Sequence, residues 1–196
     1  MATLSAAPPD SCPRCLFPPA DCLCGQFEPV PVRTEFVLLR HAAERRRRSN
    51  SGRAVANLVQ GARVIDYGAP DSPLLDTALP GANCVLLWPE GPPATPPWKG
   101  PVPGYVLVLD ATWQQARRMR RRVATLASMP TLHVASLGER QRLRITPAAG
   151  GISTLEAVAA AIELFEGEGA AASLLACYDR MVEVLHARGR SPRRRY

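Results

Sequence analysis

Short apolar runs alternate with helical patterns along most of the chain, and this alternation constrains the fold more than any other feature of the sequence. The apolar runs, which are typical of buried strands, lie at residues 36–39, 64–65, 83–88, 105–109 and 132–134. The helical patterns lie at residues 52–60, 112–123, 153–165 and 170–187. Strands that alternate with helices form βαβ units, in which consecutive strands run parallel. The sequence therefore predicts an α/β domain with a largely parallel sheet.

Two of the predicted helices carry a clear starting signal. Thr112 is followed three residues later by Gln115, and Ser153 is followed at the same spacing by Glu156. At this capping-box spacing, each side chain can satisfy a backbone N–H group of the other residue. We therefore expect helices to begin at these two points.

A proline-rich segment separates the third and fourth predicted strands. Seven prolines and three glycines lie at residues 89–104. Proline lacks the N–H group that a helix interior or an inner strand requires. The segment is therefore predicted to be a long loop, of the kind that often lines a binding site.

Four cysteines crowd into the first 24 residues, with the spacing C-x2-C-x6-C-x-C. Thiolates at short chain spacing suit zinc, which prefers four soft ligands in a tetrahedron. We expect Cys12, Cys15, Cys22 and Cys24 to bind zinc, with redox-active pairs or two local disulfides as the alternatives. Residues 1–30 are then a disordered start followed by a metal module, and residues 31–196 are the α/β domain. Cys84, Cys177 and His133 lie in apolar surroundings and are expected to be structural.

Length and composition point to a soluble protein. The chain has 196 residues, of which 46% are hydrophobic, and this suffices for one domain with a sizeable core. No apolar run reaches the roughly 18 residues that cross a bilayer. The first ten residues lack the basic and apolar regions of a signal peptide. We therefore expect a cytoplasmic protein with no membrane partner.

The charge pattern favours a polyanionic partner. The net charge is +7, and arginines cluster at residues 45–48, 117–122 and 193–195. Each contact between an arginine and a phosphate releases counterions and so stabilises binding. The clusters therefore favour nucleic acid as the partner. The alternative is that the arginines are solvated helix faces and a frayed tail.

Asp110 follows an apolar strand and directly precedes a predicted helix. Ligands of parallel α/β sheets gather at this carboxyl edge. A carboxylate placed there can act as a base, or can hold an ammonium group or a ribose hydroxyl. The alternative is that Asp110 helps to cap the helix while Trp113 packs on the sheet.

Four ordered segments of the chain resemble the DTW-domain family, the tRNA-uridine aminocarboxypropyltransferases. Asp110-Ala111-Thr112-Trp113 resembles its D-x-T-W signature, and the cysteine segment resembles its cysteine module. His41, Glu44 and Ser49-Asn50-Ser51-Gly52-Arg53 resemble its His-Pro-x-Glu and Asn-Thr-Gly-Arg stretch, with Ala42 in place of Pro and Ser51 in place of Thr. Ser153-Thr154-Leu155-Glu156-Ala157 resembles its Ser-Thr-x-Glu-Ala segment.

The resemblance implies a SPOUT-like fold with a knotted C-terminal region that holds the cofactor. It implies transfer of the 3-amino-3-carboxypropyl group of S-adenosylmethionine to N3 of a tRNA uridine, with release of 5′-methylthioadenosine. An rRNA substrate stays possible, because a related enzyme group modifies ribosomal RNA by the same chemistry. The alternatives are an RNA methyltransferase with the same cofactor and a zinc-containing RNA-binding protein without catalysis. No obligate protein partner is implied.

We assign roles to individual residues on this basis. Asp110 is the expected general base, and this role requires a raised pKa, for example through burial near Trp113. The helix start at Ser153, or alternatively Arg144, would hold the carboxylate of the transferred arm. The full set of expected cofactor contacts is Leu87, Pro89, Glu90, Thr112, Trp113, Arg144, Ser153 and Thr154. The expected RNA contacts are His41, Arg53, Arg117, Arg118 and Arg121.

Overall fold

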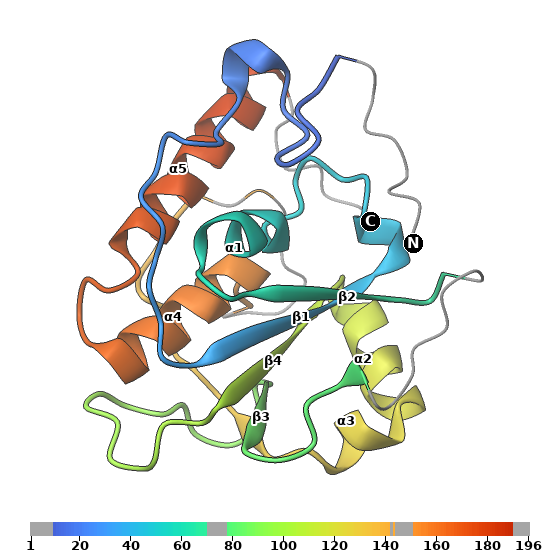
Figure 1. The fold of residues 1–196 in the computed structure, drawn as a ribbon, viewed down its shortest axis with the longest axis vertical. Coiled ribbons are helices and arrows are strands. Elements are labelled where there is room, and N and C mark those ends of the chain that lie inside the picture. The colour runs from blue at the N-terminus through green and yellow to red at the C-terminus, as the bar shows by residue number, and fades with distance from the viewer. Residues whose placement is uncertain (1–9, 70–77, 142, 144–150, 190–196) are drawn as a thin grey trace.

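The computed structural model of the chain describes residues 10–69, 78–141, 143 and 151–189 (Figure 1). Three sequence predictions lie outside these residues. They are the disordered start predicted for residues 1–10, of which only Asp10 is described, the proposed clamp Arg144 and the arginine cluster at residues 193–195.

The described part of the chain contains a five-stranded sheet in which all strand pairs are parallel. Its strands are β1 (Glu35–His41), β2 (Arg63–Tyr67), β3 (Cys84–Leu87), β4 (Tyr105–Asp110) and β5 (Thr131–Leu132). Their order across the sheet is β2-β1-β4-β3-β5. The central pair runs in register from Glu35 opposite Tyr105 to Arg40 opposite Asp110. The predicted α/β class and parallel sheet are confirmed.

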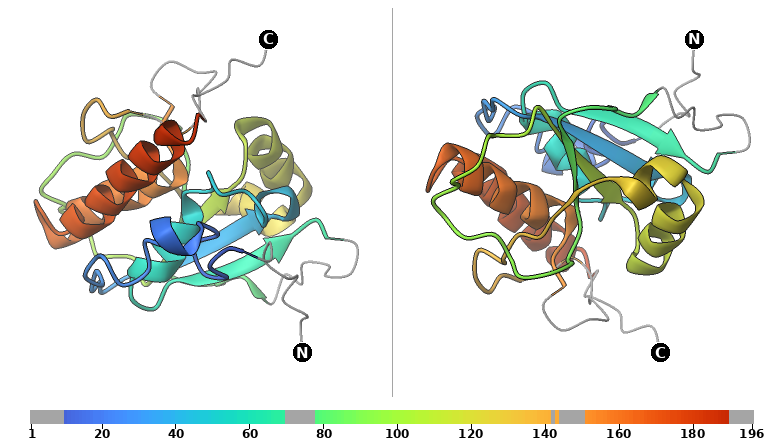
Figure 2. Two further views of the ribbon diagram at one scale, coloured as in Figure 1. Left: turned by 90° about the horizontal axis from the view of Figure 1, so that it is seen from above. Right: turned by 90° about the horizontal axis from the view of Figure 1, so that it is seen from below.

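Helices cover both faces of this sheet (Figure 2). Their bounds are α1 (Gly52–Leu58), α2 (Trp113–Arg122), α3 (Ala124–Ser128), α4 (Thr154–Glu166) and α5 (Ala172–Ala187). Two short 3-10 helices, η1 and η2, span Pro19–Asp21 and Ala42–Glu44. Phe36 and Leu38 of β1 pack with α1, α4 and α5, whereas Val37 and Leu39 pack with α2 and α3. This alternation follows from the two-residue period of a strand and leaves residues 36–39 of β1 buried on both faces of the sheet.

Helices α1, α2 and α4 begin where the sequence predicts, and α5 begins two residues later than predicted, at Ala172. Both capping boxes form, at Thr112 with Gln115 before α2 and at Ser153 with Glu156 before α4. The short helix α3 was not predicted. It begins after Val123, whose extended backbone ends α2 and turns the chain into a second, separate helix. Within the described ranges, no helix combines the length and apolar character needed to span a membrane.

The proline-rich segment between β3 and β4 contains no helix or strand, as predicted. The ring of Trp98 packs edge-on against Phe165, with ring centroids 5.4 Å apart. Phe165 lies at the end of α4, where its carbonyl accepts a hydrogen bond from Arg33, just before β1 begins. The middle of the loop therefore lies at the amino edge of the sheet, opposite the edge that carries Asp110.

The strand order creates a switch point between β1 and β4. The chain leaves β1 through α1 toward β2, and it leaves β4 through α2 and α3 toward β5, on the other side. Where neighbouring connections diverge in this way, a crevice opens outside the carboxyl ends of the two strands, and ligands of α/β sheets bind there. His41 and Asp110 end the two strands at this point.

Candidate functional site

Asp110 lies at the end of β4 in a buried, hydrogen-bonded position. Its side chain is 2% exposed. Asn50 donates from Nδ2 to one carboxylate oxygen at 2.8 Å, and the hydroxyl of Thr154 donates to the other at 3.0 Å. Each of the three segments that resemble the family at residues 49–53, 110–113 and 153–157 thus contributes one member of this group. We call Asp110, Asn50 and Thr154 the carboxylate node.

Gly52 lies directly against the carboxylate of Asp110. A Cβ atom added to Gly52 would lie 2.5 Å from Cγ of Asp110 and 2.6–2.7 Å from its two oxygens. Since real Cβ atoms do not approach other atoms this closely, no other residue fits here without moving the carboxylate. The glycine at this position is required by space.

Burial raises the pKa of the Asp110 carboxyl above its ordinary value, although hydrogen bonds from Asn50 and Thr154 act to lower it. The nearby carboxylate of Glu44 raises this pKa further, and Arg40 opposes it. The direction agrees with the expectation from the sequence. The side chains that contact the carboxylate are those of Asn50 and Thr154, whereas the ring of Trp113 packs against Trp88.

His41 ends β1 and faces α2 across the switch point. Its Nδ1 accepts a hydrogen bond from the backbone N–H of Ala43 at 3.2 Å and lies 3.3 Å from Nε2 of Gln115. Burial lowers the pKa of His41, Glu44 opposes this and Arg47 adds to it. A neutral ring with an accepting Nδ1 carries its proton on Nε2.

Two tryptophans lie on the α2 side of the same edge. Trp88, just after β3, meets Trp113 edge-on with ring centroids 6.0 Å apart. The guanidinium of Arg120 lies over the Trp88 ring at 5.0 Å and donates to Glu90 at 2.7 Å. Pro89 and Glu90 are exposed, whereas Leu87 is buried in the core and can line a ligand site only through its backbone.

The start of α4 is occupied by the chain itself. The backbone N–H of Ser153 donates to Glu156, and that of Glu156 donates to the Ser153 hydroxyl. The N–H of Leu155 donates to the hydroxyl of Ser51 at 3.4 Å. Few donors are left here for the carboxylate of a ligand, and the buried Glu156 disfavours an anion. Cofactor binding by Ser153 and Thr154 stays a prediction.

The expected RNA contacts occupy two different environments. Arg117, Arg118 and Arg121 are exposed on α2. Arg53, in α1, is partly buried, and its guanidinium donates to the backbone carbonyls of Arg14 and Arg45. Arg53 therefore joins the cysteine segment to the residues around the node in this structure.

The four N-terminal cysteines form one compact thiol cluster. Their sulfur atoms all lie within 4.8 Å of one another, with 3.8 Å between Cys12 and Cys24 and 3.7 Å between Cys15 and Cys22. Four sulfurs at about 2.3 Å from a tetrahedral zinc are about 3.8 Å apart, so the spacing fits such an ion. All six cysteines of the chain are free thiols.

The chemistry of these thiols also fits a cation. Burial acts to raise the pKa of Cys12, but hydrogen bonds from the backbone of Cys15 and Arg14 outweigh it and lower this pKa to about 6. Burial and the neighbouring sulfurs raise the pKa of Cys24. Four thiolates this close repel one another unless a positive ion lies between them. The thiol cluster can therefore hold a metal such as zinc.

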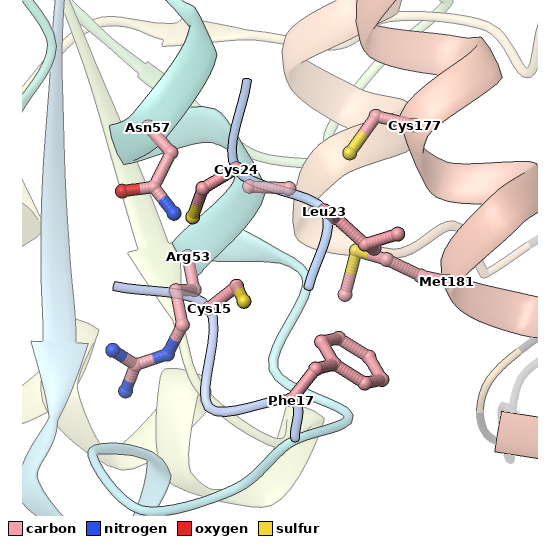
Figure 3. Close-up of a pocket in the computed structure, with 9 residues that line it drawn as sticks. Cys15, Phe17, Leu23, Cys24, Arg53, Asn57, Cys177 and Met181 are labelled. Carbon is pink, nitrogen blue, oxygen red and sulfur yellow. The ribbon is translucent and has the colours of Figure 1, made fainter. Parts of the chain in front are cut away.

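The cysteine segment packs on the α/β domain rather than standing apart. Cys15, Phe17 and Leu23 face Cys177 and Met181 of α5 across a small cavity of about 20 Å³ (Figure 3). Arg53, Ala54 and Asn57 of α1 and Cys24 complete its lining. Such a volume holds about one water molecule. The cavity is a packing gap between the segment and the two helices.

A comparison with family models matches residues 9–186 to the DTW domain. This match covers most of the chain and includes both the thiol cluster and the carboxylate node. The chain belongs to the DTW-domain family. The DTW domain is that of the tRNA-uridine aminocarboxypropyltransferases, which confirms the predicted family and points to a role in tRNA modification. No solved structure matches the chain.

The DTW match runs across residue 30, where the sequence suggested a boundary. Asn50 of the node and the neighbouring Gly52 were not predicted as site residues. The signal was present in the sequence, because both lie in the stretch that resembles the family. The resemblance does not say which of its residues meet in space.

Proposed function

We propose that this chain transfers the 3-amino-3-carboxypropyl group of S-adenosylmethionine to N3 of a uridine in tRNA, with release of 5′-methylthioadenosine. One observation carries the proposal. The match to the DTW domain spans residues 9–186, and three of its characteristic segments meet around Asp110 at the switch point of a parallel sheet.

The residues at this edge suit a nucleoside cofactor. Trp88 and Trp113 present partly exposed aromatic rings for an adenine, and the exposed carboxylate of Glu90 suits a ribose hydroxyl or an ammonium group. The sulfonium of S-adenosylmethionine supplies an electrophilic carbon, and the protein has to orient it. A SPOUT-like knotted region with Arg144 as the clamp for the arm's carboxylate belongs to this proposal.

Uracil N3 carries a proton that has to leave before the nitrogen can attack. Asp110 is the base predicted from the sequence, and this role stays a prediction. Both of its oxygens already accept a hydrogen bond, and its side chain is 2% exposed. A uracil would have to displace Asn50 or Thr154 in order to reach it.

The exposed arginines of α2 suit the phosphates of a tRNA. Arg117, Arg118 and Arg121 project from the helix that begins at the switch point, so an RNA bound to them lies close to the edge of the sheet. The thiol cluster lies in the segment that packs against α1 and α5. We propose zinc as its ion, with a structural role.

One experiment tests the function directly. The purified protein is incubated with unmodified tRNA and S-adenosylmethionine, and the nucleosides and the cofactor product are analysed by mass spectrometry. Aminocarboxypropyluridine together with methylthioadenosine is the expected result. A methylated nucleoside with S-adenosylhomocysteine would instead identify a methyltransferase, and no product would leave an RNA-binding protein. In vitro transcribed rRNA serves as the comparison substrate.

A further inference from the structure

We infer that Asp110 is a positioning residue, whose carboxylate joins the ends of three segments and so sets the geometry of the cofactor edge. This inference rests on the proposed transfer reaction for its activity readout. It deepens that function by giving Asp110, Asn50 and Thr154 a shared role.

The node connects segments that are distant in the chain. Asn50 lies 60 residues from Asp110, and Thr154 lies 44 residues from it. Asn50 directly precedes Ser51 and α1, Asp110 ends β4, and Thr154 begins α4. A single buried carboxylate therefore fixes two helix starts against one strand end.

Further hydrogen bonds tie these segments together. The side-chain oxygen Oδ1 of Asn50 accepts a hydrogen bond from the backbone N–H of Arg53 at 3.0 Å, and the side-chain Nδ2 of Asn50 donates to Asp110. The hydroxyl of Ser51 accepts the N–H of Leu155 at 3.4 Å. The starts of α1 and α4 are therefore held to each other as well as to β4.

The groups that the node positions are the expected cofactor contacts. Thr112 and Trp113 follow Asp110 by two and three residues, and Ser153 directly precedes Thr154. If the hydrogen bonds of the node were lost, the segment with Thr112 and Trp113 would move away from the segment with Ser153, although the residues expected to contact the cofactor would be unchanged. A shift of about 1 Å at such a site costs roughly 100-fold in rate.

The same geometry opposes a direct role in proton transfer. A base has to come within hydrogen-bond distance of the proton that it removes. The carboxylate of Asp110 is enclosed by Asn50, Thr154 and Gly52, and both of its oxygens have a donor. These neighbours hold the carboxylate of Asp110 in place, and they also keep the N3 proton of a uracil from reaching it.

An exchange of the two side chains separates the two roles. In the double variant Asn50→Asp/Asp110→Asn, the new carboxylate at position 50 can accept from the new amide at position 110 and from the N–H of Arg53. The amide oxygen at position 110 can still accept from Thr154. Every hydrogen bond of the node is restored, but position 110 can no longer act as a base.

Thermal unfolding and the initial rate of methylthioadenosine release are measured for the wild type, both single variants and the double variant. Asn50→Asp alone places two carboxylates side by side, and we expect the midpoint to fall by about 10 °C. The double variant recovers most of this loss and keeps its rate within about tenfold of the wild type, with an unchanged pH profile of kcat. A well-folded double variant whose rate falls by more than about 100-fold would overturn the inference and support Asp110 as the base. Failure to recover stability would also overturn it.

Thr154 provides an independent test in case the exchanged protein does not fold. Thr154→Ser keeps the hydroxyl, and Thr154→Val removes it at nearly the same volume. We expect the valine variant to lose at least about tenfold in kcat relative to the serine variant. Equal rates in the two variants would contradict a positioning role. If the wild type shows no transfer at all, the proposed function fails, while recovery of stability in the exchanged pair still decides whether the node exists as described.

Discussion

The thiol cluster and the carboxylate node are built in opposite ways. The thiol cluster gathers four cysteines from residues 12–24, and it could hold a metal ion supplied from outside the chain. The carboxylate node gathers three side chains from residues 50–154, and its donors come from the chain itself. The first cluster is local and has room for a ligand from outside the chain. The second is long-range and complete.

This difference indicates what each cluster can contribute. A local cluster organises only its own segment, since the ends that it joins are already close in the chain. A long-range cluster organises the whole domain, because it forms only when β4, α1 and α4 are all in place. Metal removal and a mutation in the node should therefore damage different parts of the molecule.

The largest effect is expected from loss of the thiol cluster. In the variant Cys12→Ser/Cys22→Ser, the protein should lose its one metal ion per chain, because two ligands are gone. Zinc contributes about 10–16 kcal/mol to the folding of isolated zinc peptides, so the N-terminal segment should unfold. Elemental analysis and hydrogen exchange of residues 10–30 measure this. Cys84→Ala, in the opposite core, is the control and should keep the metal. A metal-free protein that is folded and active would contradict the prediction.

The next largest effect is expected at Gly52. Gly52→Ala places a Cβ atom 2.5 Å from Cγ of Asp110, and we expect it to lower the free energy of unfolding by about 3 kcal/mol through overpacking. Gly81→Ala is the matched control, since nothing lies within 4 Å of its Cβ position. Chemical denaturation compares the two. A loss below about 0.5 kcal/mol at Gly52 would mean that the node has room to relax.

A smaller effect is expected in the pH dependence of stability. Burial raises the pKa of Asp110, so the native state binds its proton more tightly than the unfolded chain does. The contribution of this group to stability is therefore greatest at low pH. It falls as the pH rises from about 4, the unfolded value, through the raised native pKa, and is constant above that. The difference in unfolding free energy between the wild type and Asp110→Asn should fall over the same window.

Asp66 offers a control of opposite sign. Burial acts to raise its pKa, but hydrogen bonds from Arg40 and Arg45 outweigh this and lower it. Its contribution to stability is present above the unfolded pKa and is lost as the pH falls through the lowered native value. Asp66→Asn should therefore show the reverse trend in denaturation experiments. Parallel trends for the two variants would contradict the assignment.

The smallest effect on stability is expected at residues that belong to neither cluster. Three exposed arginines of α2 are changed singly to glutamine, in Arg117→Gln, Arg118→Gln and Arg121→Gln. Each variant should alter the free energy of unfolding by less than about 0.5 kcal/mol. Each should instead reduce the salt dependence of tRNA binding by about one phosphate contact. Arg180→Gln on α5 is the control for charge alone. If the salt dependence of tRNA binding in the three α2 variants is as unchanged as in the control, the arginines of α2 face water.

The two clusters also differ in how well the sequence predicted them. The thiol cluster follows from spacing, because cysteines so close in the chain can meet without knowledge of the fold. The position of Asp110 followed from the strand before it and the helix after it, and both capping boxes followed from residues three apart. Each of these is a local pattern.

The partners of Asp110 could not be predicted in this way. That Asn50 and Thr154 meet the same carboxylate depends on strand order, since α1 and α4 pack on one face of the sheet beside β4. The hydrogen bonding at the start of α4 depends on the fold in the same way. The backbone N–H of Leu155 donates to the hydroxyl of Ser51, which lies 104 residues earlier in the chain. Sequence reasoning therefore found the acidic residue at the edge and missed what surrounds it.

The pairing of β1 with β4 has a consequence for how the chain is made. These two central strands are about 70 residues apart in the chain, from Glu35 to Tyr105. During synthesis the cysteine segment and β1 leave the ribosome well before β4, so β1 remains without its central neighbour for several seconds at about 5–20 residues per second. The thiol cluster is already complete by then and can bind its ion. If the cluster binds a metal as proposed, loading can precede closure of the sheet, and the supply of metal during translation would then affect the yield of folded protein.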